Sequence, residues 1–309
     1  MKGFDRIRMT KINQEKFWIE LQVEVHPSLG EVISNFLIEE GSPGVIQEIG
    51  PGLSRKRRET IRAYFSNHRA FGSKKKEIER YLSSISKSHP VNLRSRIIKE
   101  EKWAEAWKSN FKALRISSRI VVKPPWETYP ISKGQIIIEI DPGMAFGTGT
   151  HPSTQMCLQA LDALIPSFPN RPSFLDVGTG SGILAIAAWK LGAKPVRAVD
   201  LDPVAVESAR KNAKANNAKG VNFRVGSLDG QRQNFDITAA NLLPQELLRL
   251  ASPLSRKVSP GGVLIVSGFL RRQGQEIAEA FRRYKLQVRL AKKDGGWACF
   301  VLEPKRGER

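Results

Sequence analysis

The 309-residue chain lacks the features of a secreted, disulfide-bonded or membrane-spanning protein. Its two cysteines, Cys157 and Cys299, cannot form a disulfide scaffold and are too few to make a structural zinc site by themselves. The longest apolar run, Ile183–Trp189, is far too short to span a bilayer. The charged N-terminal residues lack the apolar stretch of a secretory signal. We therefore expect a cytoplasmic protein.

Positive charge, in contrast, is abundant: 50 Lys and Arg residues against 30 Asp and Glu residues give a net charge of +20. Residues 1–130 and 131–309 each hold 25 basic and 15 acidic side chains, so the charge is not confined to one tail. The densest clusters are Arg55–Arg58 and Lys74–Lys76. Such a balance raises affinity for polyanions. Two interpretations stay open, a solvated surface and a surface that contacts RNA or the ribosome.

The first part of the chain, residues 1–98, alternates strand and helix signals. The order β-α-β-β-α-β predicts a small α+β domain, a ferredoxin-like sandwich. A linker helix is predicted next, within residues 99–117, with Trp103 and Trp107 on one of its faces. Packing between domains and contact with a substrate are both open roles for these two indoles. Strands are predicted over Phe17–Val25, Gly44–Ile49, Ile61–Phe65 and Val91–Ile98, and helices over Leu29–Glu40, 74–84 and Glu100–Phe111.

The second domain is predicted to span residues 118–309. It opens with a strand pair, Ile120–Val122 and Gln135–Ile140, and from Ser173 strands alternate with amphipathic helices. This alternation predicts an α/β fold with a parallel, doubly wound sheet. A short connection with Gly295-Gly296 precedes the last strand, which we expect to run antiparallel. Strands are predicted at 173–177, 196–200, 221–225, 235–240, 262–267, 286–290 and 298–302, and helices at 183–192, 203–215, 244–256 and 273–284.

The strand at 173–177 leads into a glycine-rich turn, Asp176-Val177-Gly178-Thr179-Gly180-Ser181-Gly182. Alternating glycines let the backbone turn sharply and approach a ligand closely, and open α/β sheets bind ligands at the carboxyl ends of their strands. A dinucleotide site is disfavoured, because the GxGxxG spacing is absent and Asp176 would repel a pyrophosphate. The same carboxylate would favour the ammonium and sulfonium groups of S-adenosylmethionine.

Two carboxylates follow the next strand. Asp200 ends that strand, 22 residues after Gly178, where a carboxylate can accept hydrogen bonds from both ribose hydroxyls. Asp202 precedes Pro203 and is predicted to cap the following helix.

Two further segments carry a resemblance to a known family. They are DPGMAFGTGTHPST at residues 141–154 and Asn241-Leu242-Leu243-Pro244. Together with the glycine-rich turn, they closely resemble the bacterial methyltransferases that modify large-subunit ribosomal protein eleven. The resemblance covers the catalytic half and extends more loosely to the N-terminal part. It implies a substrate-recognition domain, a linker and a class I (seven-strand, Rossmann-like) methyltransferase domain. It also implies methylation of lysine side chains and of the N-terminal α-amine of that ribosomal protein, with S-adenosylmethionine as the donor and no metal.

The resemblance also implies a set of site residues. Asn241 is in addition the candidate catalytic residue, because its side-chain carbonyl can accept a hydrogen bond from the reacting amine. A role limited to cofactor contact or strand capping is the alternative. His151 is either a general base or a local hydrogen-bonding group that holds the segment before Pro152. The expected cofactor contacts are Thr154, Gly178, Asp200 and Asn241, with Phe146, Gly147, Gly180 and Leu201 completing the pocket beside Asp176.

The expected chemistry is direct in-line transfer, in which the protein aligns and desolvates the reactants. Three alternatives remain: methylation of another protein lysine, methylation of ribosomal RNA, and a non-catalytic module that binds RNA or the ribosome. The net charge of +20 departs from the expectation for an enzyme whose substrate is itself basic. We expect a monomer that binds the ribosomal protein and does not bind membranes, and contact of its basic surface with ribosomal RNA stays open beside the solvated surface.

Overall fold

The computed structural model describes residues 17–26, 29–30, 33–34, 36–37, 40–42, 45–49, 59–66, 71–85, 91–99, 111–141, 149–228 and 233–305. The chain divides into two compact units, Met1–Asn110 and Phe111–Arg309. Each unit has a hydrophobic core of its own, and the larger one has two.

The first unit contains a four-stranded antiparallel sheet with the order β2-β3-β1-β4. Its strands are β1 (Phe17–Val25), β2 (Val45–Ile49), β3 (Glu59–Ser66) and β4 (Asn92–Lys99). Alternate residues of β1, including Leu21 and Val23, enter a core that also holds Ile33 and Ile78. Ile78 belongs to helix α2 (Phe71–Ile85), and Ile33 is one of the helical residues described between 29 and 37. The four predicted strands and the helix predicted at 74–84 are confirmed.

The second unit is built on a seven-stranded sheet with the order β10-β9-β8-β11-β12-β14-β13. The chain places β9 and β10 on one side of β8 and then returns to place β11 on the other side. The switch point of the sheet therefore lies between β8 and β11. β14 is antiparallel to both neighbours, as predicted, whereas the pairs from β10 to β12 are parallel. The strands are β8 (Phe174–Val177), β9 (Val196–Asp200), β10 (Val221–Val225), β11 (Phe235–Asn241), β12 (Val258–Leu270), β13 (Leu286–Asp294) and β14 (Trp297–Pro304).

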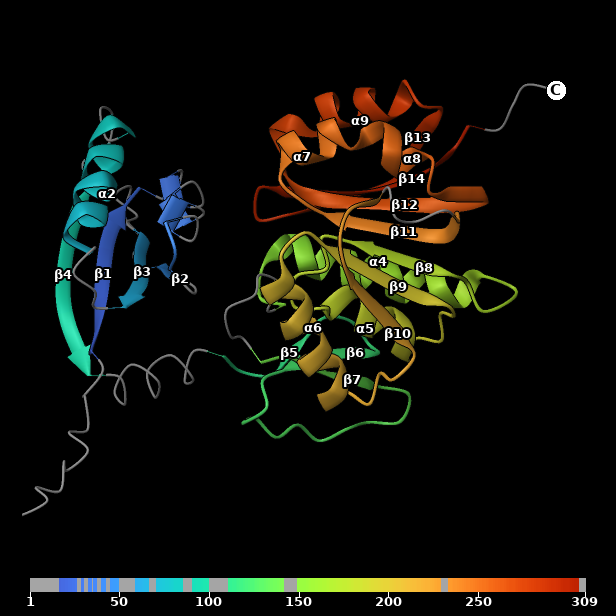
Figure 1. Ribbon diagram of the computed structural model, residues 1–309, viewed down its shortest axis with the longest axis horizontal. Coiled ribbons are helices and arrows are strands. Elements are labelled where there is room, and N and C mark those ends of the chain that lie inside the picture. Colours follow the sequence, from blue (N-terminus) through green and yellow to red (C-terminus); the bar gives the residue numbers. More distant parts are fainter. Residues whose placement is uncertain are drawn as a thin grey trace, which may run out of the picture. The chain divides into compact units, whose positions relative to one another are not determined.

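Helices cover both faces of this sheet (Figure 1). One layer consists of α4 (Pro152–Leu164), α5 (Ile183–Lys190) and α6 (Pro203–Ala215), and the other of α7 (Pro244–Arg249), α8 (Ala251–Ser255) and α9 (Gly274–Arg282). Short 3-10 helices lie at Ile165–Ser167 and Arg271–Gln273. Because both faces are covered, all four residues of β8 are buried. None of the described helices is long and apolar enough to cross a membrane.

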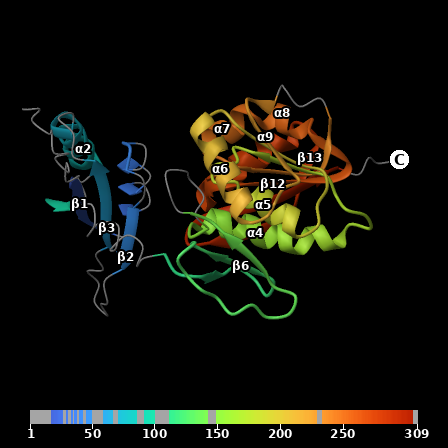
Figure 2. The same ribbon diagram turned by 60° about the horizontal axis from the view of Figure 1, so that its bottom comes forward.

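A small third sheet lies on the outer side of α5, as Figures 1 and 2 show. It has the order β5-β6-β7, with β5 at Leu114–Arg115, β6 at Ile120–Lys123 and β7 at Ile136–Glu139. The predicted pairing of the two longer strands is confirmed, and they run parallel. This sheet matters for the site because β7 leads directly into the 141–154 segment.

Three elements differ from the sequence prediction. No helix is predicted between 141 and 173, but helix α4 begins within the 141–154 segment, with Pro152–Thr154 as its first turn. The helix predicted at 244–256 is divided at Leu250, because Pro253 has no amide hydrogen to donate to a preceding carbonyl. The end of the predicted linker, residues 111–117, is not helical, since Leu114 pairs with Val122 in a strand. The rest of that helix, with both of its tryptophans, lies outside the described residues.

Candidate active site

The switch point brings the glycine-rich turn and Asn241 to the same edge of the sheet. Val177 of β8 pairs with Ala240 of β11, so Gly178 and Asn241 follow neighbouring strands at matching heights. Gly178 has φ of +70° and Gly182 has φ of +82°, in the left-handed region that favours glycine. A Cβ at Gly178 would collide with the side chain of Leu242, and one at Gly182 would lie 2.9 Å from the Cβ of Ala209. The positive φ and these close contacts favour glycine at both positions.

Asp176, the first residue of the glycine-rich turn, is completely buried. Its Oδ2 accepts a hydrogen bond of 2.7 Å from the hydroxyl of Thr179. Its Oδ1 has no partner of ordinary geometry within the described parts of the chain, although the nearby amide of Ala185 lowers the pKa somewhat. Burial is the dominant influence and raises the pKa of Asp176 to about 7. The carboxylate is therefore held where a cationic partner would stabilise it strongly.

Asp200 lies at the carboxyl end of β9 and contacts the same turn. Its Oδ2 accepts from the amide of Gly180 at 2.9 Å, and its Oδ1 accepts from the amide of Asp202 at 3.0 Å. The predicted cap is confirmed, since Asp202 accepts at 2.8 Å from the amide of Val204 at the start of α6. The carboxylate of Asp200 is thus fixed against the glycine-rich turn.

Exposed apolar side chains lie beside this carboxylate. Leu201 follows β9 and is 65% exposed, and Val225 ends the neighbouring strand β10 and is 52% exposed. Asp200 of β9 pairs with Val225. An apolar surface next to hydrogen-bonding groups suits a flat heterocycle joined to a sugar. Leu201 was predicted from the sequence, whereas Val225 was not; its signal is an apolar residue directly before Gly226.

Asn241 ends β11 on the other side of the turn. Its Nδ2 donates to the hydroxyl of Thr154 at 3.2 Å, and Thr154 is buried in the first turn of α4. Its Oδ1 is buried and has no hydrogen-bond partner among the described residues. Such a buried acceptor is costly unless a ligand supplies a donor.

Gly268, which sequence reasoning missed, leaves room for this arrangement. It has φ of +93°, and a Cβ there would collide with the carbonyl oxygen of Leu242 and lie 3.1 Å from Oδ1 of Asn241. The available signal was a glycine directly after the strand predicted at 262–267. The absence of a side chain at Gly268 thus leaves space next to Oδ1 of Asn241.

His151 is a helix cap. Its Nδ1 accepts from the amide of Ser153 at 3.2 Å and lies 2.6 Å from the Ser153 hydroxyl. Its ring also packs edge-on against Trp297, with centroids 4.5 Å apart. Burial lowers the pKa of His151 to about 4, so the imidazole is neutral at pH 7. The interpretation as a local hydrogen-bonding group is confirmed.

Seven of the nine predicted site residues fall within the described residues: Thr154, Asp176, Gly178, Gly180, Asp200, Leu201 and Asn241. All of them lie at the carboxyl edge of the sheet or next to it, and Phe146 and Gly147 are outside the described residues. Within the described ranges, no group of three or more His, Cys, Asp and Glu side chains could hold a metal ion.

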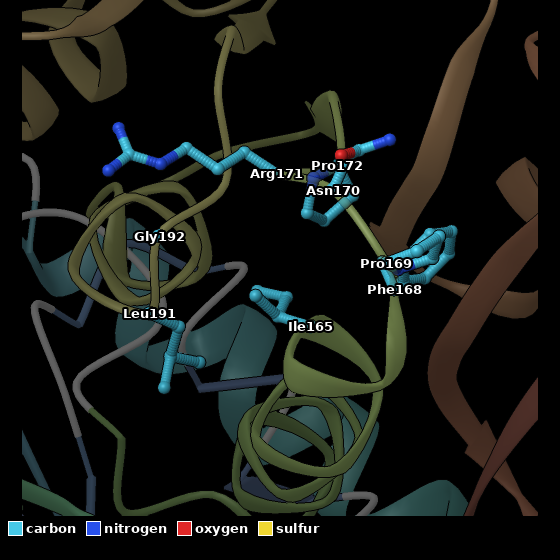
Figure 3. A pocket seen from close by; sticks show the side chains of 8 residues that line it. All are labelled: Ile165, Phe168, Pro169, Asn170, Arg171, Pro172, Leu191 and Gly192. Atoms are coloured by element: carbon cyan, nitrogen blue, oxygen red, sulfur yellow. The ribbon is translucent and has the colours of Figure 1, made fainter.

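A cavity of about 430 Å³ lies elsewhere (Figure 3). It is formed by the segments that precede β8 and β9, at the amino ends of these strands, and so lies at the opposite edge from the turn. Ligands of open α/β sheets bind at the carboxyl ends, so this cavity is not the candidate active site. Its lining residues are Ile165, Phe168, Pro169, Asn170, Arg171, Pro172, Leu191 and Gly192.

A glycine-rich turn beside carboxylates, at the switch point of a sheet whose last strand is antiparallel, is characteristic of one class of enzyme, and this chain is an S-adenosylmethionine-dependent methyltransferase. The family model described as "Ribosomal protein L11 methyltransferase (PrmA)" matches residues 17–305. The chain belongs to this family. The predicted family, enzyme class and methyl donor are thereby confirmed.

Individual relatives agree with this assignment. A ribosomal protein L11 methyltransferase from Pelobacter propionicus is 36% identical over 298 residues, which cover 92% of this chain and 96% of the relative. One from Anoxybacillus flavithermus is 37% identical over 313 residues, which cover 93% of this chain and 99% of the relative. The crystal structure of a ribosomal protein L11 methylase from Lactobacillus delbrueckii subsp. bulgaricus is 34% identical, with a TM-score of 0.59, and covers 63% of this chain and 100% of that chain.

Proposed function

We propose that this enzyme transfers methyl groups from S-adenosylmethionine to lysine side chains and the N-terminal α-amine of ribosomal protein L11. The names of the relatives support the substrate. One observation supports an amine as the methyl acceptor. The side-chain oxygen of Asn241 is buried beside the glycine-rich turn and has no hydrogen-bond partner among the described residues.

The described residues fit the donor in charge and polarity. Asp176 is proposed to face the ammonium group, because its Oδ1 is a buried acceptor that has no hydrogen-bond partner of ordinary geometry among the described residues. Asp200 is proposed to accept from the ribose hydroxyls, with Leu201 next to the adenine. Thr154, Gly178 and Gly180 are proposed to line the remaining wall, together with Phe146 and Gly147. When bound, the donor supplies an electrophilic methyl group on a good leaving group.

The protein's own part is to prepare the amine. Lysine has an ordinary pKa of about 10.4 and must lose its proton before it can attack. His151 is half-buried and its Nδ1 accepts a hydrogen bond within its own turn, so we assign it no proton transfer. We propose that desolvation favours the neutral amine, whose proton passes to solvent water, and that Oδ1 of Asn241 accepts a hydrogen bond from the neutral amine, which directs its lone pair toward the methyl group.

The decisive experiment supplies labelled S-adenosylmethionine together with free L11, an unrelated lysine-rich protein and ribosomal RNA. Mass spectrometry then locates the label. Label in L11 at lysine and N-terminal amines supports the proposal. Label in RNA alone, or in the unrelated protein to the same extent, contradicts it, and cofactor binding without turnover would identify a non-catalytic module.

We further propose the domain limits expected from the sequence: a ferredoxin-like substrate-recognition domain at 1–98, a linker at 99–117 and the methyltransferase domain at 118–309. The sheet order β2-β3-β1-β4 supports the first of these, as does the core shared by its strands with two helical segments. We also propose that the enzyme acts in the cytoplasm as a monomer. Arg289 and Lys293 on the edge strand β13 support the monomer, because like charges oppose pairing of this edge with a second copy.

We propose ribosomal RNA as a second partner, bound by a basic surface that residues 271–293 form. This segment holds eight basic and two acidic side chains, and β13 within it is exposed along most of its length. The double variant Arg283→Glu/Lys293→Glu should weaken RNA binding and flatten its dependence on salt. Lys214→Glu/Lys219→Glu, with the same charge change on exposed residues of another surface, is the control. Equal losses in both variants would show attraction by net charge without a defined surface.

A further inference from the structure

Two asparagines of α6, Asn212 and Asn216, are buried although they lie one turn apart in a polar run of sequence. Their exposed fractions are 3% and 5%. Asn216 accepts from the amide of Glu139 at 2.8 Å and donates to the carbonyl of the same residue. A primary amide carries the donor and the acceptor of a peptide group. Asn216 therefore pairs with the free edge of β7 as a neighbouring strand would.

Asn212 forms a bridge between two segments that are far apart in the sequence. Its Oδ1 accepts from the amide of Asp141 at 3.2 Å, and its Nδ2 donates to the carbonyl of Ser181 at 2.9 Å. Asp141 opens the 141–154 segment, and Ser181 belongs to the glycine-rich turn. One buried side chain thus sets the spacing between both.

The packing around the turn supports this role independently. Gly182 comes so close to α6 that a Cβ there would lie 2.9 Å from the Cβ of Ala209, one turn before Asn212. The other end of the segment is also fixed, since Gln155 donates to the carbonyl of Thr150 at 2.8 Å. Gly149 is packed tightly between Val122 and Ile183. Asp141 on one side and Gly149 and Thr150 on the other are therefore held in place, and Asn212 ties Asp141 to the glycine-rich turn.

We infer that Asn212 is a positioning residue for the methyl donor, holding the start of the 141–154 segment at a fixed distance from the glycine-rich turn. Asn216 binds β7 at Glu139, two residues before Asp141, and makes no hydrogen bond to the glycine-rich turn within the described part of the chain, so its role is structural. This inference rests on the proposed donor site. It predicts that the two asparagines differ in their effect on donor affinity although both make buried hydrogen bonds.

The test compares Asn212→Ala with Asn216→Ala in the full-length enzyme. Calorimetry with S-adenosylmethionine gives Kd, thermal unfolding gives Tm, and steady-state kinetics give KM for the donor and for L11 separately. We expect Asn212→Ala to raise the Kd and KM for the donor at least about tenfold, with kcat at saturating donor and KM for L11 near wild type. Asn216→Ala should lower Tm by a similar amount and change donor Kd less than about threefold.

A near-isosteric variant covers the case in which Asn212→Ala does not fold. Asn212→Asp keeps an acceptor for the amide of Asp141 but places a carboxylate oxygen against the carbonyl of Ser181, so donor affinity should again fall. A wild-type Kd in either Asn212 variant overturns the inference, as do equal Kd changes in the Asn212 and Asn216 variants. Failure of the wild-type enzyme to bind S-adenosylmethionine would instead overturn the proposed donor site.

Discussion

Replacement of Asp176 by Asn should make the free enzyme more stable above neutral pH while it weakens binding of the methyl donor. Burial raises the pKa of this carboxyl from its ordinary value of 3.8 to about 7. A raised pKa means that the folded protein binds the proton more tightly than the unfolded chain. The stability linked to this group is therefore complete below pH 3.8 and is lost as the pH rises to about 7.

The size of the effect follows from the shift. Each pKa unit corresponds to about 1.4 kcal/mol, so ionisation of Asp176 costs at most about 4 kcal/mol at about pH 8. Between about pH 5.5 and about pH 8, the group loses about 2 kcal/mol of this linked stability. An asparagine has no charge to lose and should show no such change. Removal of the carboxylate should also cost about 10- to 100-fold in donor affinity, the usual effect of a hydrogen bond to a charged group.

Urea unfolding of both proteins at the two pH values measures the first effect. The difference in unfolding free energy between variant and wild type should grow by about 2 kcal/mol from the lower to the higher pH. All other titrating groups are shared, so their contributions cancel. If the unfolding free energies of the two proteins changed in parallel with pH, the inference that burial raises the pKa of Asp176 would be refuted. Calorimetry at about pH 8 measures the second effect, and unchanged donor affinity would refute the proposed ammonium contact.

Three further substitutions test the rest of the site. Asp200→Ala should lower donor affinity at least about 100-fold, because a fixed carboxylate loses its proposed ribose contacts; near-normal affinity by calorimetry contradicts that assignment. Asn241→Ala should reduce kcat about 100-fold and raise donor Kd by a smaller factor, about tenfold or less, because the residue is expected to contact both the donor and the amine; equal changes in both would mean a cofactor contact only. Gly268→Ala, at φ of +93° and against the Leu242 carbonyl, should lower the unfolding free energy by about 1–3 kcal/mol; a variant as stable as wild type by urea unfolding would disprove the steric argument.

Much of the fold could be predicted because strands and amphipathic helices alternate from Ser173 onward. Helix α4 was missed for a physical reason. Met156, Cys157 and Leu158 are consecutive and all buried, so the helix lacks the single apolar stripe that marks an amphipathic helix. Its start signals were nevertheless present in the sequence, with His151 as the cap and Pro152 at the first helical position.

The site was predictable where its residues follow strands, and less so where tertiary contacts decide their role. Asp176, Asp200 and Asn241 all lie at strand ends, which a sequence pattern can locate. Asn212 and Asn216 lie in the polar run 211–219, which has the composition of a solvated helix surface. Only the approach of β7 and the glycine-rich turn buries them, and no local pattern encodes that approach.

The two central strands have a consequence for how this enzyme can adapt to its substrate. β8 and β11 are adjacent, almost entirely buried and covered by helices on both faces. Amide hydrogens in such strands exchange with solvent at rates close to those of global unfolding. Asp176 and Asn241, which are proposed to bind the ammonium group of the methyl donor and the target amine, lie in these two strands, so the spacing between them should be among the most rigid features of the molecule. If the enzyme methylates several different amines, the surface that binds the substrate must then present each of them to this rigid site in the same position.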